Sequence, residues 1–324
     1  MQRSKAFKQF FRNWMLVIAM ITGASAYMIY HSIPEIHFMG PALNSFVSVI
    51  QPVLLFIMLF LTFCKMEPKE LKVQKWQIWL LLIQGGAYAG ISYLLILHPD
   101  IPGRLAIEAA MICLICPTAT ACAVVTGKLG GNITSVISYT ILINLLVAII
   151  IPLMVPLTNP VEGLDFWSAS AKILAKVFPL LIMPFLSAWA LRYFAPKVHA
   201  AVMKKSYISF YIWAFSLTLA IAVGTKYIVS NNGSVLQLAG IAGASLLACA
   251  FQFLCGKAVG SRYGYKITAG QVMGQKNTVF AIWIGYTFYS PIVSVAGAFY
   301  SIWHNCYNTY QLHKAAQSTP SSSQ

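Results

Sequence analysis

Polar and helix-breaking residues interrupt two long apolar stretches of this sequence. The first interruption is CPTATA at 116–121, and the second is GQVMGQKN at 270–277, which contains Lys276. A lysine amine near the centre of a bilayer costs about 3 kcal/mol unless it is paired or hydrated. The residues around such an amine are therefore candidates for binding an ion or a charged ligand.

The composition identifies the solvent around these two stretches. The chain has 324 residues, of which 59% are hydrophobic and 9% are charged, and its mean hydropathy is +0.72. Soluble domains are about 25% charged, so most side chains here must face lipid or one another. The apolar runs are continuous and do not alternate, which favours helices over a barrel. The sequence therefore predicts an all-α integral membrane protein.

The apolar runs predict ten transmembrane spans. They are 14–30, 41–64, 76–97, 104–127, 133–157, 168–191, 207–229, 234–256, 268–289 and 291–312. Because five spans precede the external linker 158–167 and five follow it, the halves 1–157 and 168–312 would be inverted relative to each other if they are repeats. The tail 313–324 is small and polar, which predicts disorder.

Lysine and arginine residues gather at one set of span ends. Under the positive-inside rule this asymmetry places both termini in the cytoplasm of a multi-pass protein in the cell membrane, a bacterial inner membrane. The first span also has the form of a signal peptide, with a basic start and small residues at Ala24 and Ala26. We interpret it as a retained helix, because cleavage would reverse the charge pattern. The net charge of +15 lies at span ends and does not indicate nucleic-acid binding.

The two interruptions occupy corresponding places, in the fourth span of each half. Pro117 removes a backbone donor and restricts Cys116 to an extended conformation. Gly270 and Gly274 flank the polar run of the ninth span. Matched breaks of this kind in two halves are the sequence feature that points most directly to the binding site of a secondary transporter.

Around these breaks the chain resembles the bile acid:sodium symporter superfamily. The residues that carry the resemblance are Cys116, Pro117, Thr120 and Ala121 in the fourth span, Val272 and Gln275 in the ninth, and Trp303, His304 and Asn305 in the tenth. The resemblance implies that broken spans four and nine cross in a core domain formed by spans 3, 4, 5, 8, 9 and 10. A panel of spans 1, 2, 6 and 7 would face this core, with substrate bound between them.

The departures from the family pattern concern its sodium sites. The Ser-Asn pair that follows the first break reads Cys122 and Ala123, and the glutamate that heads the second polar run reads Gln271. The family sodium-site positions that stay polar are Gln84, Gln275 and Thr140. All seven acidic residues lie in loops or near span ends: Glu35, Glu67, Glu70, Asp100, Glu108, Glu162 and Asp165. Since sodium favours oxygen ligands with nearby negative charge, the sodium site is expected to be lost.

Lys276 stands where the family has an asparagine, so we interpret it as a tethered cation that replaces bound sodium. The polar residues expected around it are Thr120, Gln271, Gln275 and Asn277. His304 is a candidate for handling protons because histidine titrates near neutrality, although its place in the family motif favours a structural role.

These features predict a transporter of an organic anion, a bile acid or another carboxylate, working by alternating access without sodium and with protons as a candidate coupling ion. No enzyme motif, metal site or cofactor site is recognisable, and the expected partners are the substrate and the lipid bilayer, with the oligomeric state left open. Two alternatives remain. One is an arsenite-type oxyanion exporter that uses Cys116 as a soft ligand, and the other is a membrane receptor or interaction protein that no longer transports.

Overall fold

The computed structural model describes residues 2–65, 72–230 and 234–318, and every regular element in these ranges is helical. The first elements are α1 (Gln2–Ser32), the 3-10 helix η1 (Pro34–Met39), α2 (Gly40–Cys64), α3 (Lys75–Leu97), α4 (Arg104–Ile115), α5 (Cys122–Lys128) and α6 (Ile133–Thr158). They are followed by α7 (Phe166–Leu181), α8 (Met183–Phe194), α9 (Pro196–Lys204), α10 (Ile208–Ser230), α11 (Val235–Ser261), α12 (Lys266–Gly274), α13 (Thr278–Phe288) and α14 (Val295–Ser318).

Among the described residues, six helical segments are long and apolar enough to cross a bilayer. They are Pro34–Cys64, Lys75–Leu97, Ile133–Thr158, Phe166–Phe194, Ile208–Lys226 and Val235–Ser261, and the shorter apolar helix Thr278–Phe288 accompanies them. In hydrocarbon a helix satisfies its backbone hydrogen bonds within its own segment. The chain is therefore a multi-pass α-helical membrane protein.

Three features differ from the predicted spans. The segment predicted as 168–191 is divided at Ile182 into α7 and α8, because Pro184 has no N–H to donate to the carbonyl one turn earlier. The short helix α9 was not predicted, since its mixed polar and apolar residues give no long apolar run. The prediction of disorder over 313–324 is wrong for 313–318, which continue α14 and include two alanines, strong helix formers. Residues 319–324, Glu67 and Glu70 lie outside the described residues.

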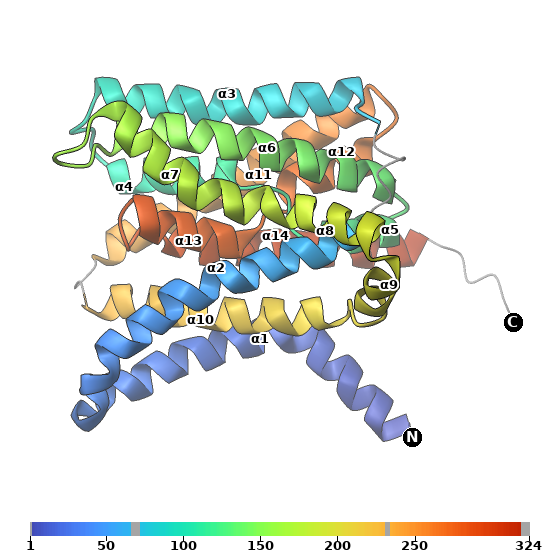
Figure 1. The fold of residues 1–324 in the computed structure, drawn as a ribbon, viewed down its shortest axis with the longest axis horizontal. Coiled ribbons are helices and arrows are strands. Elements are labelled where there is room, and N and C mark those ends of the chain that lie inside the picture. The colour runs from blue at the N-terminus through green and yellow to red at the C-terminus, as the bar shows by residue number, and fades with distance from the viewer. Residues whose placement is uncertain (1, 66–71, 231–233, 319–324) are drawn as a thin grey trace, which may run out of the picture.

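The helices form two layers that meet along one interface (Figure 1). The α10 layer consists of α1, α2, α8, α9 and α10, and the α11 layer consists of α3 to α6 and α11 to α14. The helix α7 contacts α6 of one layer and α2 and α8 of the other. Contacts of α13 with α2 and α10, and of α14 with α10, join the layers.

The long helices run along a common direction, and the start of α1 and the end of α14 lie at the same end of the molecule (Figure 1). At the opposite end, Arg104 donates to Glu108 at 2.9 Å and to the carbonyl oxygen of Thr158 at 2.8 Å. The ion pair lies within α4, and the hydrogen bond to Thr158 ties α4 to the end of α6. The carboxylate of Glu108 is therefore paired with Arg104, and it lies near the end of a helix, as predicted.

Candidate functional site

The first helix break separates α4 from α5. Helix α4 ends at Ile115, and Cys116 leaves the helical conformation with φ −50° and ψ 137°. Pro117, which follows, favours this extended conformation in the residue before it. Helical structure resumes at Cys122, so that the backbone groups of 116–121 must find partners outside a helix.

The second break separates α12 from α13. Helix α12 ends at Gly274, and Gln275 is extended with φ −93° and ψ 98°. Asn277 begins the next helix by accepting a hydrogen bond from the Phe280 N–H to its side-chain oxygen at 3.2 Å. Asparagine is a favoured residue at this position because it satisfies a backbone donor that the helix leaves free.

The two breaks cross and pair with each other through their backbones. Thr118 and Lys276 form an antiparallel bridge. The Ala119 N–H donates to the Gln275 carbonyl oxygen at 2.8 Å, and the Asn277 N–H donates to the Pro117 carbonyl oxygen at 2.9 Å. Each break thus supplies partners that the other lost, which permits non-helical backbone at membrane depth.

Side chains of the α11 layer satisfy further carbonyl oxygens at the crossing. Gln84 of α3 donates to the carbonyl oxygens of Ile115 at 3.2 Å and Cys116 at 3.1 Å, and it accepts from the Tyr139 hydroxyl at 3.1 Å. The Tyr300 hydroxyl donates to the Gly274 carbonyl oxygen at 2.8 Å. This face of the crossing is therefore held by specific hydrogen bonds.

The face of the crossing toward the α10 layer is different, because it encloses a small cavity of about 40 Å³. Its lining comes from both breaks, from α14 and from Met58 of α2 and Trp213 of α10. Four lining residues have a buried side-chain atom without a hydrogen-bond partner in the described structure: Gln275 (Oε1), Lys276 (Nζ), Asn277 (Nδ2) and His304 (Nδ1). Other described residues, among them Gln51, Asn144 and Ser216, also have such atoms, but four such atoms gather at this one cavity. Buried polar groups usually find a partner in the protein or in water, so the cavity is a candidate place for water or a ligand.

Lys276 is buried, with 1% of its surface exposed. The ionisable groups that interact with it are the thiols of Cys113, Cys116, Cys122 and Cys249, and none of them is a carboxylate. No described acidic residue forms an ion pair with Lys276, so Lys276 is a buried amine without a counter-charge among the described residues. A negatively charged ligand would compensate it.

Of the residues predicted around this amine, Thr120, Gln275 and Asn277 line the cavity with Lys276, whereas Gln271 does not. The Gln271 amide nitrogen donates to the Asn308 side-chain oxygen at 3.0 Å, and its own oxygen is buried without a partner in the described structure. Gln271 therefore lies behind the crossing, toward α14.

The remaining family sodium-site positions also lie away from the cavity. Gln84 is engaged at the first break as described above. The Thr140 hydroxyl donates to the carbonyl oxygen of Val136 in its own helix at 2.8 Å. Cys122 is buried with its sulfur 3.7 Å from the Thr126 hydroxyl, and Ala123 is half-buried in α5. The structure does not bring these residues together at the cavity.

The two glycines of the second polar run have packing roles. A Cβ on Gly274 would lie 2.3 Å from the Phe253 ring, and one on Gly270 would lie 2.6 Å from the Lys257 side chain. Gly270 is inside α12, not at its end. Both glycines thus allow α12 to approach α11 closely, and the break itself begins after Gly274.

His304 has both a packing contact and a nitrogen without a partner in the described structure. Its ring packs edge-on against Tyr300, with ring centroids 5.6 Å apart, and it also lines the cavity with an unpartnered nitrogen. Met58 and Trp213 could not be predicted from the sequence, because nothing in their local pattern distinguishes them from other apolar residues that face a neighbouring helix. Asn305, also in the lining, belongs to the Trp-His-Asn motif and could have been included among the predicted site residues.

Comparison with models of known protein families and with curated proteins finds no match to this chain.

Proposed function

We propose that this chain is a secondary transporter that binds an organic anion at the crossing of its two helix breaks, with Lys276 as a resident cation. The observation that carries the proposal is the cavity lined by four unpartnered polar side-chain atoms, one of them the Lys276 amine. It lies where two broken helices meet, which is the place of substrate sites in many transporter folds. On this proposal the protein is not an enzyme.

The charge of the site favours an anion. A buried amine without a carboxylate partner attracts negative charge, and the N-terminus of α13, which starts at Thr278 beside Lys276, adds positive potential. The amide nitrogen of Asn277 and the hydroxyl of Thr120 supply hydrogen-bond donors. Met58 and Trp213 provide an apolar wall, which suits the hydrocarbon part of a carboxylate such as a bile acid.

The size of the cavity supports alternating access. A volume of about 40 Å³ is close to that of a single water molecule in liquid, about 30 Å³, and far below the roughly 300–1,000 Å³ of small-molecule sites. The wall comes from both layers, so moving the α10 layer away from the α11 layer would enlarge the site without breaking the backbone pairing of the two breaks.

Transport would not require sodium. The amine already supplies a positive charge at the crossing, and Gln84 and Thr140 are engaged elsewhere. Neutral oxygens alone make a poor site for a hard cation. His304, with an unpartnered nitrogen in the cavity wall, is the residue through which a proton could be coupled to the substrate.

The architecture that we propose is that of the bile acid:sodium symporter superfamily. It has ten spans in two inverted repeats, with broken spans four (α4 and α5) and nine (α12 and α13) in the core. The panel would comprise α1, α2, α7 with α8, and α10. The motif residues at both breaks and the paired breaks themselves support this assignment. Both termini would lie in the cytoplasm of a bacterial cell, on the basic side of the inner membrane.

An arsenite-type oxyanion is the second candidate because the thiols of Cys113, Cys116, Cys122 and Cys249 are near enough to Lys276 to interact with it electrostatically. Cys116 and Cys122 do not line the cavity, however, and the described residues contain no cluster of three or more histidine, cysteine or acidic side chains that could hold a metal. The organic anion is therefore the preferred cargo.

The experiment is uptake of radiolabelled bile acids, other carboxylates and arsenite into proteoliposomes, in sodium-free and in sodium buffer over a range of pH. We expect uptake of a carboxylate in sodium-free buffer. Strict dependence on sodium would contradict the role of Lys276 as the resident cation. Binding of a carboxylate without any uptake would identify a receptor.

A further inference from the structure

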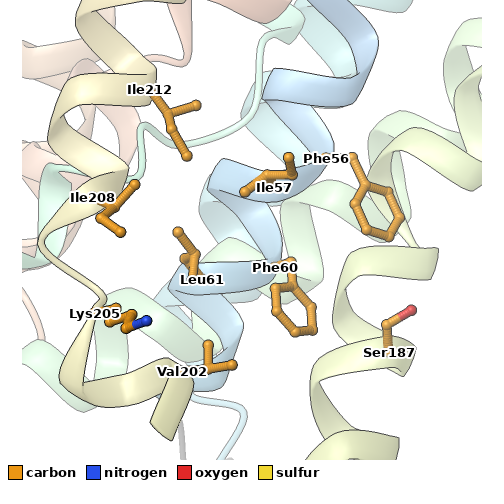
Figure 2. Close-up of a pocket in the computed structure, with 9 residues that line it drawn as sticks. All are labelled: Phe56, Ile57, Phe60, Leu61, Ser187, Val202, Lys205, Ile208 and Ile212. Carbon is orange, nitrogen blue, oxygen red and sulfur yellow. The ribbon is translucent and has the colours of Figure 1, made fainter.

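A second and larger cavity lies within the α10 layer, and no residue of the paired breaks lines it. Its volume is about 460 Å³, and it is lined by Phe56, Ile57, Phe60, Leu61, Ser187, Val202, Lys205, Ile208 and Ile212. Figure 2 shows these side chains on α2, α8, α9 and α10, with Lys205 in the turn between α9 and α10. We propose that this groove binds an anionic phospholipid, with an acyl chain between α2 and α10 and the phosphate at Lys205.

The groove and the cavity at the breaks have no lining residue in common. On α2, Met58 lines the cavity at the breaks, whereas Phe56, Ile57, Phe60 and Leu61 line the groove. Phe56 and Phe60 are each two residues from Met58, a rotation of about 200° in a helix of 3.6 residues per turn, so they lie opposite Met58, and Ile57 and Leu61 extend the groove around the side of α2. On α10, Ile212 of the groove precedes Trp213 of the small cavity. The groove is thus separate from the substrate site proposed above.

The lining has the chemistry of an acyl-chain site. Seven of the nine lining residues are aliphatic or aromatic, and the exceptions are Ser187 and Lys205. Along α10 the groove extends from Ile208 to Ile212, about 6 Å at the rise of a helix, and it continues to Lys205 in the turn before α10. A groove of this length can hold part of a lipid chain below its headgroup.

The charge lies at one end of the groove. Figure 2 shows the Lys205 amine directed into the space between α10 and α2, and no described residue shares a hydrogen bond or ion pair with it. Lys65, which follows the last residue of α2, adds a second positive charge at this end of α2. The described acidic residue of this layer, Glu35, precedes the opposite end of α2. A basic pocket between helices at the membrane surface attracts anionic headgroups.

The other described acidic residues are also distant from this end. Asp165 starts α7, at the far end of the α7 and α8 pair, and Asp100, Glu108 and Glu162 lie in or beside the connections at that same end, around α4 and α6. Two acidic residues, Glu67 and Glu70, follow Lys65 in the sequence but lie outside the described residues. Among the described residues, this end of the groove therefore carries positive charge without nearby acidic side chains, which favours an anionic ligand.

The test is native mass spectrometry of the purified full-length protein after incubation with phosphatidylglycerol or phosphatidylcholine of identical chains. We expect phosphatidylglycerol to be retained more strongly. Lys205→Gln should lower its retention about fivefold, whereas the matched variant Lys204→Gln, which removes the same charge from the neighbouring residue outside the groove, should leave it unchanged.

A second variant tests the acyl chain independently of the charge. Ile208→Trp places a larger side chain in the groove and should lower the retention of both lipids, with helical content unchanged by circular dichroism. Equal retention of the two lipids by the wild type, or equal effects of Lys205→Gln and Lys204→Gln, would overturn the proposal. Because the readout is bound lipid, it does not depend on whether the chain transports an anion.

Discussion

The two faces of the helix crossing differ in whether their polar atoms have hydrogen-bond partners. On the face toward α3 and α14, Gln84 and Tyr300 satisfy carbonyl oxygens that the breaks set free. On the face toward α2 and α10, Gln275, Lys276 and Asn277 keep atoms without partners. Broken helices can evidently be satisfied by side chains, so the breaks alone do not explain the unpartnered atoms. Behind the crossing the Gln271 oxygen is also without a partner in the described structure, so the contrast concerns the carbonyl oxygens of the breaks. It supports the proposal that the face toward α2 and α10 binds a ligand.

The largest expected loss of stability comes from the satisfied face. Gln84→Leu would leave the carbonyl oxygens of Ile115 and Cys116 and the Tyr139 hydroxyl without their present partner, at a cost of about 3 kcal/mol. The matched variant Gln275→Leu removes a glutamine whose oxygen has no partner, and it should change stability by less than about 1 kcal/mol. Thermal unfolding of both variants in detergent measures the difference, and equal losses would erase the contrast between the faces.

Removing the charge of Lys276 should raise the stability of the protein, in contrast to the loss expected at Gln84. Lys276→Met keeps the length of the side chain and removes a buried amine without a counter-charge, which should stabilise the protein by about 2 kcal/mol. Lys257→Met is the control, because the Lys257 amine already donates to the Tyr307 hydroxyl at 2.8 Å and lies over its ring. Its removal should not stabilise. A fall in the melting temperature of Lys276→Met would show that the amine is a structural group.

Asn277 has one side-chain atom with a partner and one without. Its oxygen caps α13, and its nitrogen has no partner in the described structure. Asn277→Ala should cost about 1 kcal/mol through loss of the cap. Asn277→Ser retains a capping oxygen and should keep the stability, yet it removes the amide donor and should still weaken uptake. Equal melting temperatures of Asn277→Ala and Asn277→Ser would contradict the capping role of the Asn277 oxygen.

The smallest effect is expected at Asp165, outside the spans, where hydrogen bonds from the Ser168 hydroxyl and from the N–H groups of Ser168 and Trp167 lower the pKa of its carboxyl group. A lowered folded-state pKa stabilises above the unfolded value, about 4, and this contribution is lost as the pH falls through the folded value. Asp165→Asn should therefore remove a small part of the pH dependence below about pH 4. Uptake at neutral pH should be unchanged.

Much of the helical pattern could be predicted from the sequence, because lipid requires long apolar runs. The boundaries of α2, α3 and α6 agree with the predicted spans to within a residue or so. The structure departs where apolar length is not the deciding property, as at Pro184 between α7 and α8 and in the short helix α9.

The site was harder to predict than the helices. Lys276, Gln275 and Asn277 were found because polar residues in an apolar run stand out, and the structure places all three at the cavity. Met58 and Trp213 come from the other layer, and only the packing of layers reveals them. Gln84 was assigned by resemblance to a sodium site, whereas its hydrogen bonds show that it satisfies the first break. Residue type predicts polarity but not which partner satisfies it.

The most direct test of the account is uptake of an organic anion in sodium-free proteoliposomes by the wild type, Lys276→Met and Lys257→Met. Loss of a buried charge that pairs with substrate costs at least about 2 kcal/mol, so Lys276→Met should lower uptake at least about 30-fold. Lys257→Met should transport as the wild type does. Undiminished uptake by Lys276→Met would contradict the claim that this amine binds the anion in place of sodium.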